Sequence, residues 1–219
     1  MWCIGRITAE YRKRMYNLLH LYRLPYRKQE PVVCIDEKSK QLLQDSRSPL
    51  PAKPGAPAKL DYEYKRSGTS NVFVAVEPKG GRRVAEVTAH RAKPDFVRFV
   101  KILLEQTYPS ARKVHLVLDN LNTHFRSSFE EVLGRTAAAH LLRRVKFHYT
   151  PKHASWLNMA EIEIGILDRQ CLDRRWPDRA TMISEVAAWQ QRRNTERCGI
   201  EWTFTRQDAD RKLAKYYVS

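Results

Sequence analysis

The amino-acid sequence predicts one substantial domain of the mixed α/β class, with a small central sheet flanked by helices. Short apolar, β-branched runs alternate with longer segments whose apolar residues recur at helical spacing, a pattern typical of such folds. The 219 residues, 42% of them hydrophobic, suffice to bury a real core. Two of the apolar runs end in an aspartate, Asp36 and Asp119, which predicts acids at the carboxyl edge of the sheet, where ligand sites of α/β folds gather.

The first half of the chain is predicted to hold a helix, a strand, a basic loop and three further strands. Apolar residues at helical spacing predict the helix over 9–23, and a β-branched run predicts the strand over 32–35, ending in Asp36. Four prolines predict an extended loop over 45–60. Alternating or β-rich runs then predict strands over 62–66, 71–77 and 82–88.

Helices outnumber strands in the predicted second half. Pro94 favours a helix start, because proline is tolerated in the first helical turn. The same patterns predict strands over 114–118 and 145–149 and a helix from about 126 to 143. Further helices are predicted from near Ser155, from near Asp178 and within 203–217.

The charge balance indicates a polyanionic partner. Forty Lys and Arg against 24 Asp and Glu give a net charge of +16, which favours nucleic acid. A basic protein with a solvated surface, or one associated with the ribosome, remains the alternative. No apolar run is long enough to cross a bilayer, and no secretory signal is visible. The spacing of the four cysteines argues against a zinc cluster or a disulfide framework, so we expect a reducing, cytoplasmic setting.

A third acid is expected from the helix predicted near Ser155, which is the candidate N-cap. Glu161 would lie in its second turn, while Glu163 would point about 200° away at 3.6 residues per turn, so only one of them can face the strand acids. We choose Glu161. Each acid alone is commonplace, as a turn residue or a solvated helix charge. Together with the basic chain, Asp36, Asp119 and Glu161 predict a Mg²⁺ or Mn²⁺ site for phosphodiester chemistry.

Other hydrolase classes fit the sequence poorly. There is no GxSxG motif for a serine nucleophile and no cysteine in a motif of that kind. Nor is there a GxxxxGK[ST] loop of the type that cradles the phosphates of a nucleoside triphosphate.

Several motifs of the chain, taken in order, resemble one family of enzymes. They are CIDEKSKQL at 34–42, YEYKRSGTSNVFVAVEP at 62–78, LVLDNLNTH at 116–124, HYTPKHASWLNMAEIE at 148–163 and RQCLDRRWPD at 169–178, with the tail from Trp202 to Leu213. This set resembles the DDE transposases of bacterial insertion sequences of the "six-thirty" type, relatives of the mariner elements. The resemblance covers nearly the whole chain.

The resemblance implies a ribonuclease H-like fold and a two-metal mechanism. The family's acids fall on Asp36, Asp119 and Glu161, the last in its LNxxE pattern, and the histidine of its DNxxxH motif falls on His124. Two Mg²⁺ or Mn²⁺ ions would serve DNA cleavage, then strand transfer of the freed 3′ hydroxyl, with TA dinucleotides as targets. Side chains expected to support the acids are His124, Asn120, Asn158 and His153.

DNA is the expected partner, as element ends and as target. Lysines and arginines near the acids would contact its backbone, and Trp156 would stack on an unpaired base or, more in keeping with its position, pack in the core. The candidates for backbone contacts are Lys38, Lys40, Arg47, Lys53, Lys59 and Lys152.

One departure from the family pattern concerns the N-terminus. Only about 30 residues precede the first predicted strand, whereas family members carry a helix-turn-helix region there, so the chain looks truncated. We expect a helical remnant over 1–30, the catalytic domain over 31–200 and a tail over 201–219. The full-length protein would be a homodimer in the bacterial cytoplasm, associated with the nucleoid. The alternatives are an inactive remnant that only binds DNA, or another ribonuclease H-like metal nuclease.

Overall fold

A mixed five-stranded sheet forms the centre of the molecule. The computed structural model describes residues 6–48, 50–59 and 62–218. The strands lie in the order β3-β2-β1-β4-β5; β1 is antiparallel to β2, β2 is antiparallel to β3, and β4 is parallel to both β1 and β5. Their bounds are β1 Val32–Asp45, β2 Tyr64–Glu77, β3 Arg82–Thr88, β4 Val114–Leu118 and β5 Val145–Tyr149. This sheet, with its flanking helices, confirms the predicted fold class.

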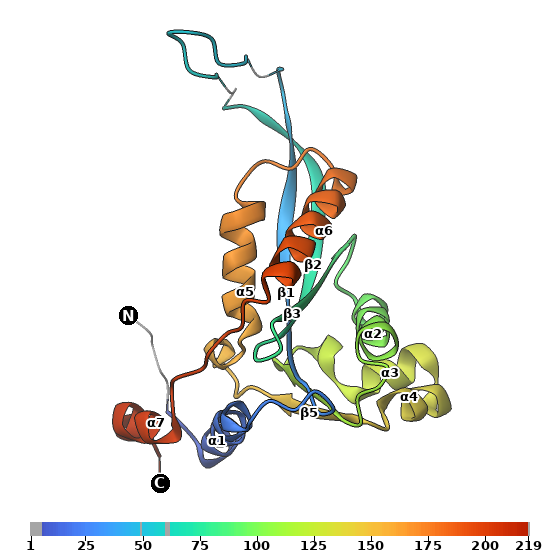
Figure 1. The fold of residues 1–219 in the computed structure, drawn as a ribbon, viewed down its shortest axis with the longest axis vertical. Helices are drawn as coiled ribbons and strands as arrows, with labels where there is room; N and C mark the ends of the chain where they lie inside the picture. The colour runs from blue at the N-terminus through green and yellow to red at the C-terminus, as the bar shows by residue number, and fades with distance from the viewer. Residues whose placement is uncertain (1–5, 49, 60–61, 219) are drawn as a thin grey trace.

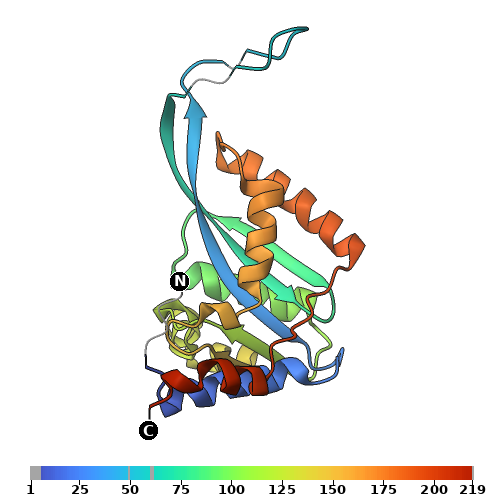
Figure 2. The same ribbon diagram turned by 90° about the vertical axis from the view of Figure 1, so that its left-hand side faces the viewer.

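Helices cover both faces of the sheet (Figure 1, Figure 2). One face carries α2 and the pair α3 and α4, and the other carries α1, α5, α6 and α7. The helices are α1 Ala9–Arg23, α2 Lys93–Ile102, α3 Arg126–Leu133, α4 Arg135–Leu142, α5 Ala160–Leu167, α6 Arg179–Glu196 and α7 Arg206–Leu213. Short turns of 3₁₀ or π type add η1 Leu103–Thr107, η2 Asn122–His124, η3 Ser155–Leu157, η4 Asp168–Leu172 and η5 Ala214–Tyr216.

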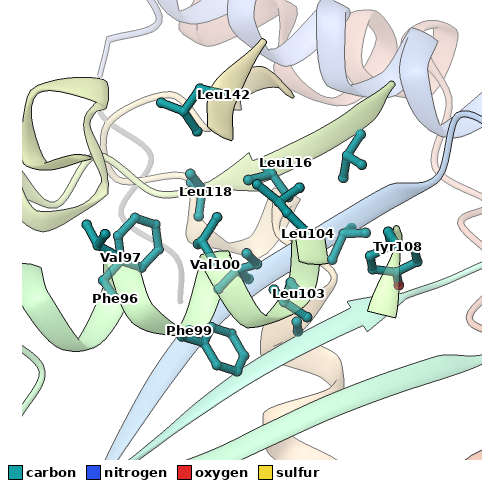
Figure 3. Close-up of a cluster of buried hydrophobic side chains, with 14 of the residues drawn as sticks. Phe96, Val97, Phe99, Val100, Leu103, Leu104, Tyr108, Leu116, Leu118 and Leu142 are labelled. Atoms are coloured by element: carbon teal, nitrogen blue, oxygen red, sulfur yellow. The ribbon is translucent and has the colours of Figure 1, made fainter. Parts of the chain in front are cut away.

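Strand alternation divides the core between the two faces. Successive side chains of a strand point to opposite sides, so Val33 and Ile35 pack under α2 while Cys34 packs toward α1 and α5. Figure 3 shows the apolar cluster on the α2 side of the sheet, in which α2 side chains such as Phe96 and Val100 lie against Leu116 and Leu118 of β4. None of the described helices is long and apolar enough to span a membrane.

Two strand predictions need correction. The first strand does not end at 35 but continues to Asp45, and the strands expected over 62–66 and 71–77 form the single strand β2. The reason is mutual pairing: β1 and β2 form a long antiparallel ribbon whose backbone groups satisfy one another even where the side chains are exposed. The outer end of this ribbon and the proline-rich segment project beyond the helices (Figure 1).

Two helix predictions also need correction. The helix expected over 126–143 is split at Gly134, whose positive φ of 79° ends α3. The helix expected near Ser155 begins only at Ala160, because Ser155 opens a 3₁₀ turn instead of capping the helix. Glu161 therefore lies in the first turn of α5, not the second. The helix beginning after Asp178 is confirmed, with the Asp178 side chain accepting a hydrogen bond from the Thr181 backbone.

Candidate active site

Asp36 lies where β1 outruns its parallel neighbour. The parallel register joins Val32–Cys34 of β1 to His115–Val117 of β4. Two residues later, Asp36 is paired only with Val74 of β2, on the antiparallel side. Its Oδ1 accepts a hydrogen bond from the Glu37 backbone N–H at 2.8 Å, and the residue is 9% exposed. Asp36 is thus a nearly buried acid at the carboxyl edge of the parallel strands.

Asp119 is the first residue beyond β4 and lies at the same edge. Its Oδ1 accepts two hydrogen bonds, from His124 Nδ1 at 2.6 Å and from the Leu121 backbone N–H at 3.1 Å. Burial alone would raise the pKa of Asp119, but the hydrogen bond and positive charge of His124 lower it below the usual value. Asp119 is therefore held as a carboxylate.

Glu161 is an exposed residue in the first turn of α5, and Asn158 ties that turn to β1. The Glu161 backbone N–H donates to the Asn158 carbonyl at 3.1 Å. The fully buried Asn158 side chain donates through Nδ2 to the Ile35 carbonyl at 2.9 Å, and Nδ2 lies 3.5 Å from Asp36 Oδ2. The start of α5 is thereby fixed beside Asp36, although Asn158 precedes the helix instead of sharing its polar face.

Burial and neighbouring negative charges both act on Asp36. Burial above all, and then the negative charges of Glu161, Glu37 and Asp119, raise the pKa of Asp36 from 3.8 to about 7. Such a group of hard oxygen donors, mutually repulsive when ionised, has the chemistry of a Mg²⁺ or Mn²⁺ site. Among the described residues, no three Asp, Glu, His or Cys side chains already stand together as a ready-made metal cage. Metal binding would require the carboxylates to approach one another.

Glu37 is an acid of this region that sequence reasoning missed. Its side chain is 2% exposed and its Oε2 lies 3.2 Å from His124 Nε2. Burial alone would lower the pKa of His124, but Asp119 and Glu37 on its two sides raise it to about 9. Strand alternation sends the residue after Asp36 to the other face of the sheet, but the predicted strand ended before Glu37 and the sequence does not show that His124 lies on that face.

Glu163 points away from these acids, as the helical spacing predicts. It is fully buried and forms a double hydrogen bond with Arg83 of β3, at 2.7 and 3.0 Å. Arg193 of α6 lies 3.4 Å from the same carboxylate. This buried ion cluster joins α5 to β3 and α6, a role for which the sequence offered no signal.

The other expected supporting residues have different surroundings. Asn120 accepts a hydrogen bond from Arg14 at 2.7 Å and donates to the Thr150 carbonyl at 2.5 Å, so it joins the β4 end to α1 and to the end of β5. His153 is an exposed loop residue with a positive φ of 61°, and no contact with the acids is seen in the described part of the chain. Trp156 packs against Trp202 and Phe204, which fits the core role.

The candidate DNA-binding residues fall into two groups. Lys38 and Lys40 lie on β1 and share Asp168 as an ion-pair partner, at 3.6 and 4.0 Å. The remaining four are exposed loop residues; three belong to the projecting segment between β1 and β2, and one to the loop after β5: Arg47, Lys53, Lys59 and Lys152.

Comparison with known proteins places the chain in a sequence family. Residues 31–183 match the model of the DDE superfamily endonucleases, a span that contains all three predicted acids. No curated protein sequence matches the chain significantly.

Two solved structures resemble the fold. The Mos1 mariner paired-end complex with Mn gives a TM-score of 0.55 at 14% sequence identity, covering 90% of this chain and 61% of that one. The Mos1 paired-end complex with Mg gives a TM-score of 0.50 at 15% identity, covering 100% and 66%. The chain thus spans less than two thirds of the length of these structures. At such low identity the likeness establishes the fold, which agrees with the predicted ribonuclease H-like architecture.

Proposed function

We propose, from the premise that this chain belongs to the DDE superfamily endonucleases, that it is the catalytic domain of a cut-and-paste DNA transposase. Its reaction would be metal-dependent cleavage of a DNA phosphodiester followed by strand transfer. The observation that carries the proposal is the position of Asp36, a nearly buried acid with Asp119 at the same edge of the parallel strands and the α5 turn of Glu161 fixed beside it. Burial first, and then the negative charges of neighbouring acids, raise the pKa of Asp36 to about 7. A nearly buried acid among like charges costs stability unless a cation is bound, so such an arrangement points to a function.

Asp36, Asp119 and Glu161 would hold the divalent ions, Mg²⁺ or Mn²⁺. The two similar Mos1 structures are complexes with Mn and with Mg, which supports dependence on such ions. When bound, a pair of divalent ions supplies Lewis-acid stabilisation of the attacking and leaving oxygens. The protein's own contribution is positional: Asn158 holds the α5 turn against β1, and His124 fixes one oxygen of Asp119.

DNA would lie along the basic surface near these acids. Lys152 belongs to the loop between β5 and α5, and Lys38 and Lys40 follow Asp36 on β1. Contacts from such side chains to phosphates give affinity without sequence information and weaken with salt. Arg47, Lys53 and Lys59 on the projecting segment would extend the same contact surface. TA dinucleotides are the proposed target.

We also propose the division of the chain into a helical segment over 1–30, a catalytic domain over 31–200 and a tail over 201–219. The first and last parts pack on one another, since Ile7 and Tyr217 form a β-bridge and α1 lies beside α7 (Figure 2). Both add to the apolar cluster that contains Cys34 of β1. A homodimer on paired element ends is the proposed assembly of the full-length protein.

The direct experiment incubates the chain with Mn²⁺ and supercoiled DNA. We expect nicking that is lost on chelation and in Asp119→Ala, and retained in Asp173→Ala, which removes an exposed aspartate after η4. Duplexes with pre-cut ends bearing a 3′ hydroxyl should be joined to target DNA, a product that a simple nuclease does not make. Equal nicking by the wild type and Asp119→Ala would reject Asp119 as a metal ligand.

A further inference from the structure

We propose that Glu37 is a positioning residue for Asp119: acting through His124, it holds one oxygen of the Asp119 carboxylate and leaves the other for a divalent cation. The inference rests on the proposed function, because it concerns how one of the proposed metal ligands is oriented. Asp36 and Glu37 would then be neighbours in sequence with separate duties on opposite faces of the sheet.

The Glu37 side chain is buried on the face of the sheet opposite to Asp36. Asp36 faces the Asn158 side of the sheet, so Glu37, next in the strand, points to the side covered by α2. There the carboxylate is almost completely buried, and Arg91 lies no closer than 3.9 Å. In the described part of the chain, neither Glu37 Oε2 nor His124 Nε2 forms a hydrogen bond, so the contact between them is an ion pair. A buried, poorly paired carboxylate costs free energy, so its one close cationic neighbour, His124, is significant.

The ring of His124 lies between the carboxylates of Glu37 and Asp119. Nε2 lies 3.2 Å from Glu37 Oε2, and Nδ1 lies 2.6 Å from Asp119 Oδ1. The ring is fully buried and packs on Phe96 at a centroid distance of 4.5 Å, while the His124 carbonyl accepts a hydrogen bond from Tyr149 at 3.1 Å. These contacts leave the imidazole little freedom to turn.

The two carboxylate oxygens of Asp119 differ in their surroundings. Oδ1 is used twice, by His124 and by the Leu121 backbone. No hydrogen bond or ion pair reaches Oδ2 from the residues that the structure describes. Asp119 thus offers one oxygen, in an orientation set by His124 and therefore by Glu37. Because β1 carries Glu37 and Asp119 follows β4, the bridge also ties the end of β4 to the part of β1 that bears Asp36.

The test measures Mn²⁺ binding directly, by electron paramagnetic resonance of the free ion titrated with protein. Partners that orient a metal ligand change metal affinity by about 10–100-fold when removed. We expect Glu37→Gln to weaken Mn²⁺ binding about tenfold or more, and His124→Asn to do the same. The double variant should bind no more weakly than His124→Asn alone, because Glu37 acts through that ring. Glu86→Gln is the matched control, because this partly buried glutamate of β3 pairs with Arg98 and also has one oxygen without a hydrogen-bond partner. The Mn²⁺ affinity of this variant should equal that of the wild type.

Thermal unfolding of each variant verifies that it folds, and Glu37→Asp serves as the second variant, since it retains the charge but shortens the reach to His124. It too should weaken Mn²⁺ binding. Wild-type affinity in a folded Glu37→Gln or Glu37→Asp would overturn the proposal, and so would additive losses in the double variant. If Asp119→Ala loses Mn²⁺ while the Glu37 variants bind normally, this inference alone fails. If the wild type neither binds Mn²⁺ nor nicks DNA, the proposed function fails first.

Discussion

Replacing Asp36 by asparagine should stabilise the metal-free protein at alkaline pH, although it removes a proposed metal ligand. The carboxylate is nearly buried, and this burial, followed by the negative charges of Glu161, Glu37 and Asp119, raises the pKa of Asp36 from 3.8 to about 7. Because the folded state binds this proton more tightly than the unfolded state does, Asp36 makes folding less favourable as the pH rises above 3.8, up to about 7. Asparagine has nearly the same shape and carries no charge, so it removes this pH dependence.

The size of the effect follows from the two pKa values. Between pH 5 and pH 8, the unfolded aspartate is ionised over the whole interval, whereas the folded one is ionised only over about the last pH unit. The difference of roughly two pH units corresponds to about 3 kcal/mol. For a chain of 219 residues, this should move the melting temperature by roughly 5–10 °C. The stability advantage of Asp36→Asn over the wild type should therefore grow by that amount from pH 5 to pH 8.

The assay is unfolding by urea and by heat, followed by circular dichroism in the presence of a chelator at both pH values. Adding Mn²⁺ at pH 8 should then stabilise the wild type, because a ligand that binds the folded state raises stability. The difference in unfolding free energy between Asp36→Asn and the wild type should therefore become smaller. An advantage of Asp36→Asn that is equal at pH 5 and pH 8, or a variant less stable than the wild type at pH 8, would refute the electrostatic reasoning.

Three further predictions concern the scaffold and the DNA surface. Arg83→Ala should lower the free energy of unfolding by about 3–5 kcal/mol in urea titrations, because it removes the two short hydrogen bonds to the buried Glu163 charge and leaves it only the longer contact with Arg193; a loss under 1 kcal/mol would contradict this. Gly81→Ala should destabilise the fold by more than about 1 kcal/mol, since φ is 65° and the new Cβ would lie 2.5 Å from the Arg197 carbonyl oxygen; an unchanged melting temperature would count against it. Lys152→Ala should reduce the slope of log affinity against log salt by about one, measured by fluorescence anisotropy, and an unaltered slope would remove Lys152 from the DNA surface.

Local pattern was enough to predict the fold class and most elements. The strands of 114–118 and 145–149 and the helix of 9–23 coincide with β4, β5 and α1, because each has a clear apolar period. The β1–β2 ribbon was not predicted as such, since its outer half is exposed and held by pairing that one strand's sequence does not contain. The break at Gly134 depends on a positive φ, which a glycine can adopt easily, but the presence of a glycine does not by itself predict that conformation.

For the site, the sequence predicted Asp36 and Asp119 from their place after apolar runs, and chose Glu161 over Glu163 from helical geometry. The structure places Glu163 in a buried ion cluster and puts Glu161 close enough to Asp36 to raise the pKa of Asp36. Glu37 was missed because its partner, His124, is distant in sequence and meets it only once β1 and β4 are side by side. Such contacts depend on tertiary structure.

Asp36, Asp119 and Glu161 should close around divalent metal ions. The most direct measurement is a crystal structure of the chain grown with Mn²⁺, in which anomalous scattering locates the ions. We predict an ion bound by Asp36 and by the free Oδ2 of Asp119, with Glu161 drawn in as a ligand of the same centre. Ions found only elsewhere, or an Asp36 region without anomalous density at saturating Mn²⁺, would contradict the account.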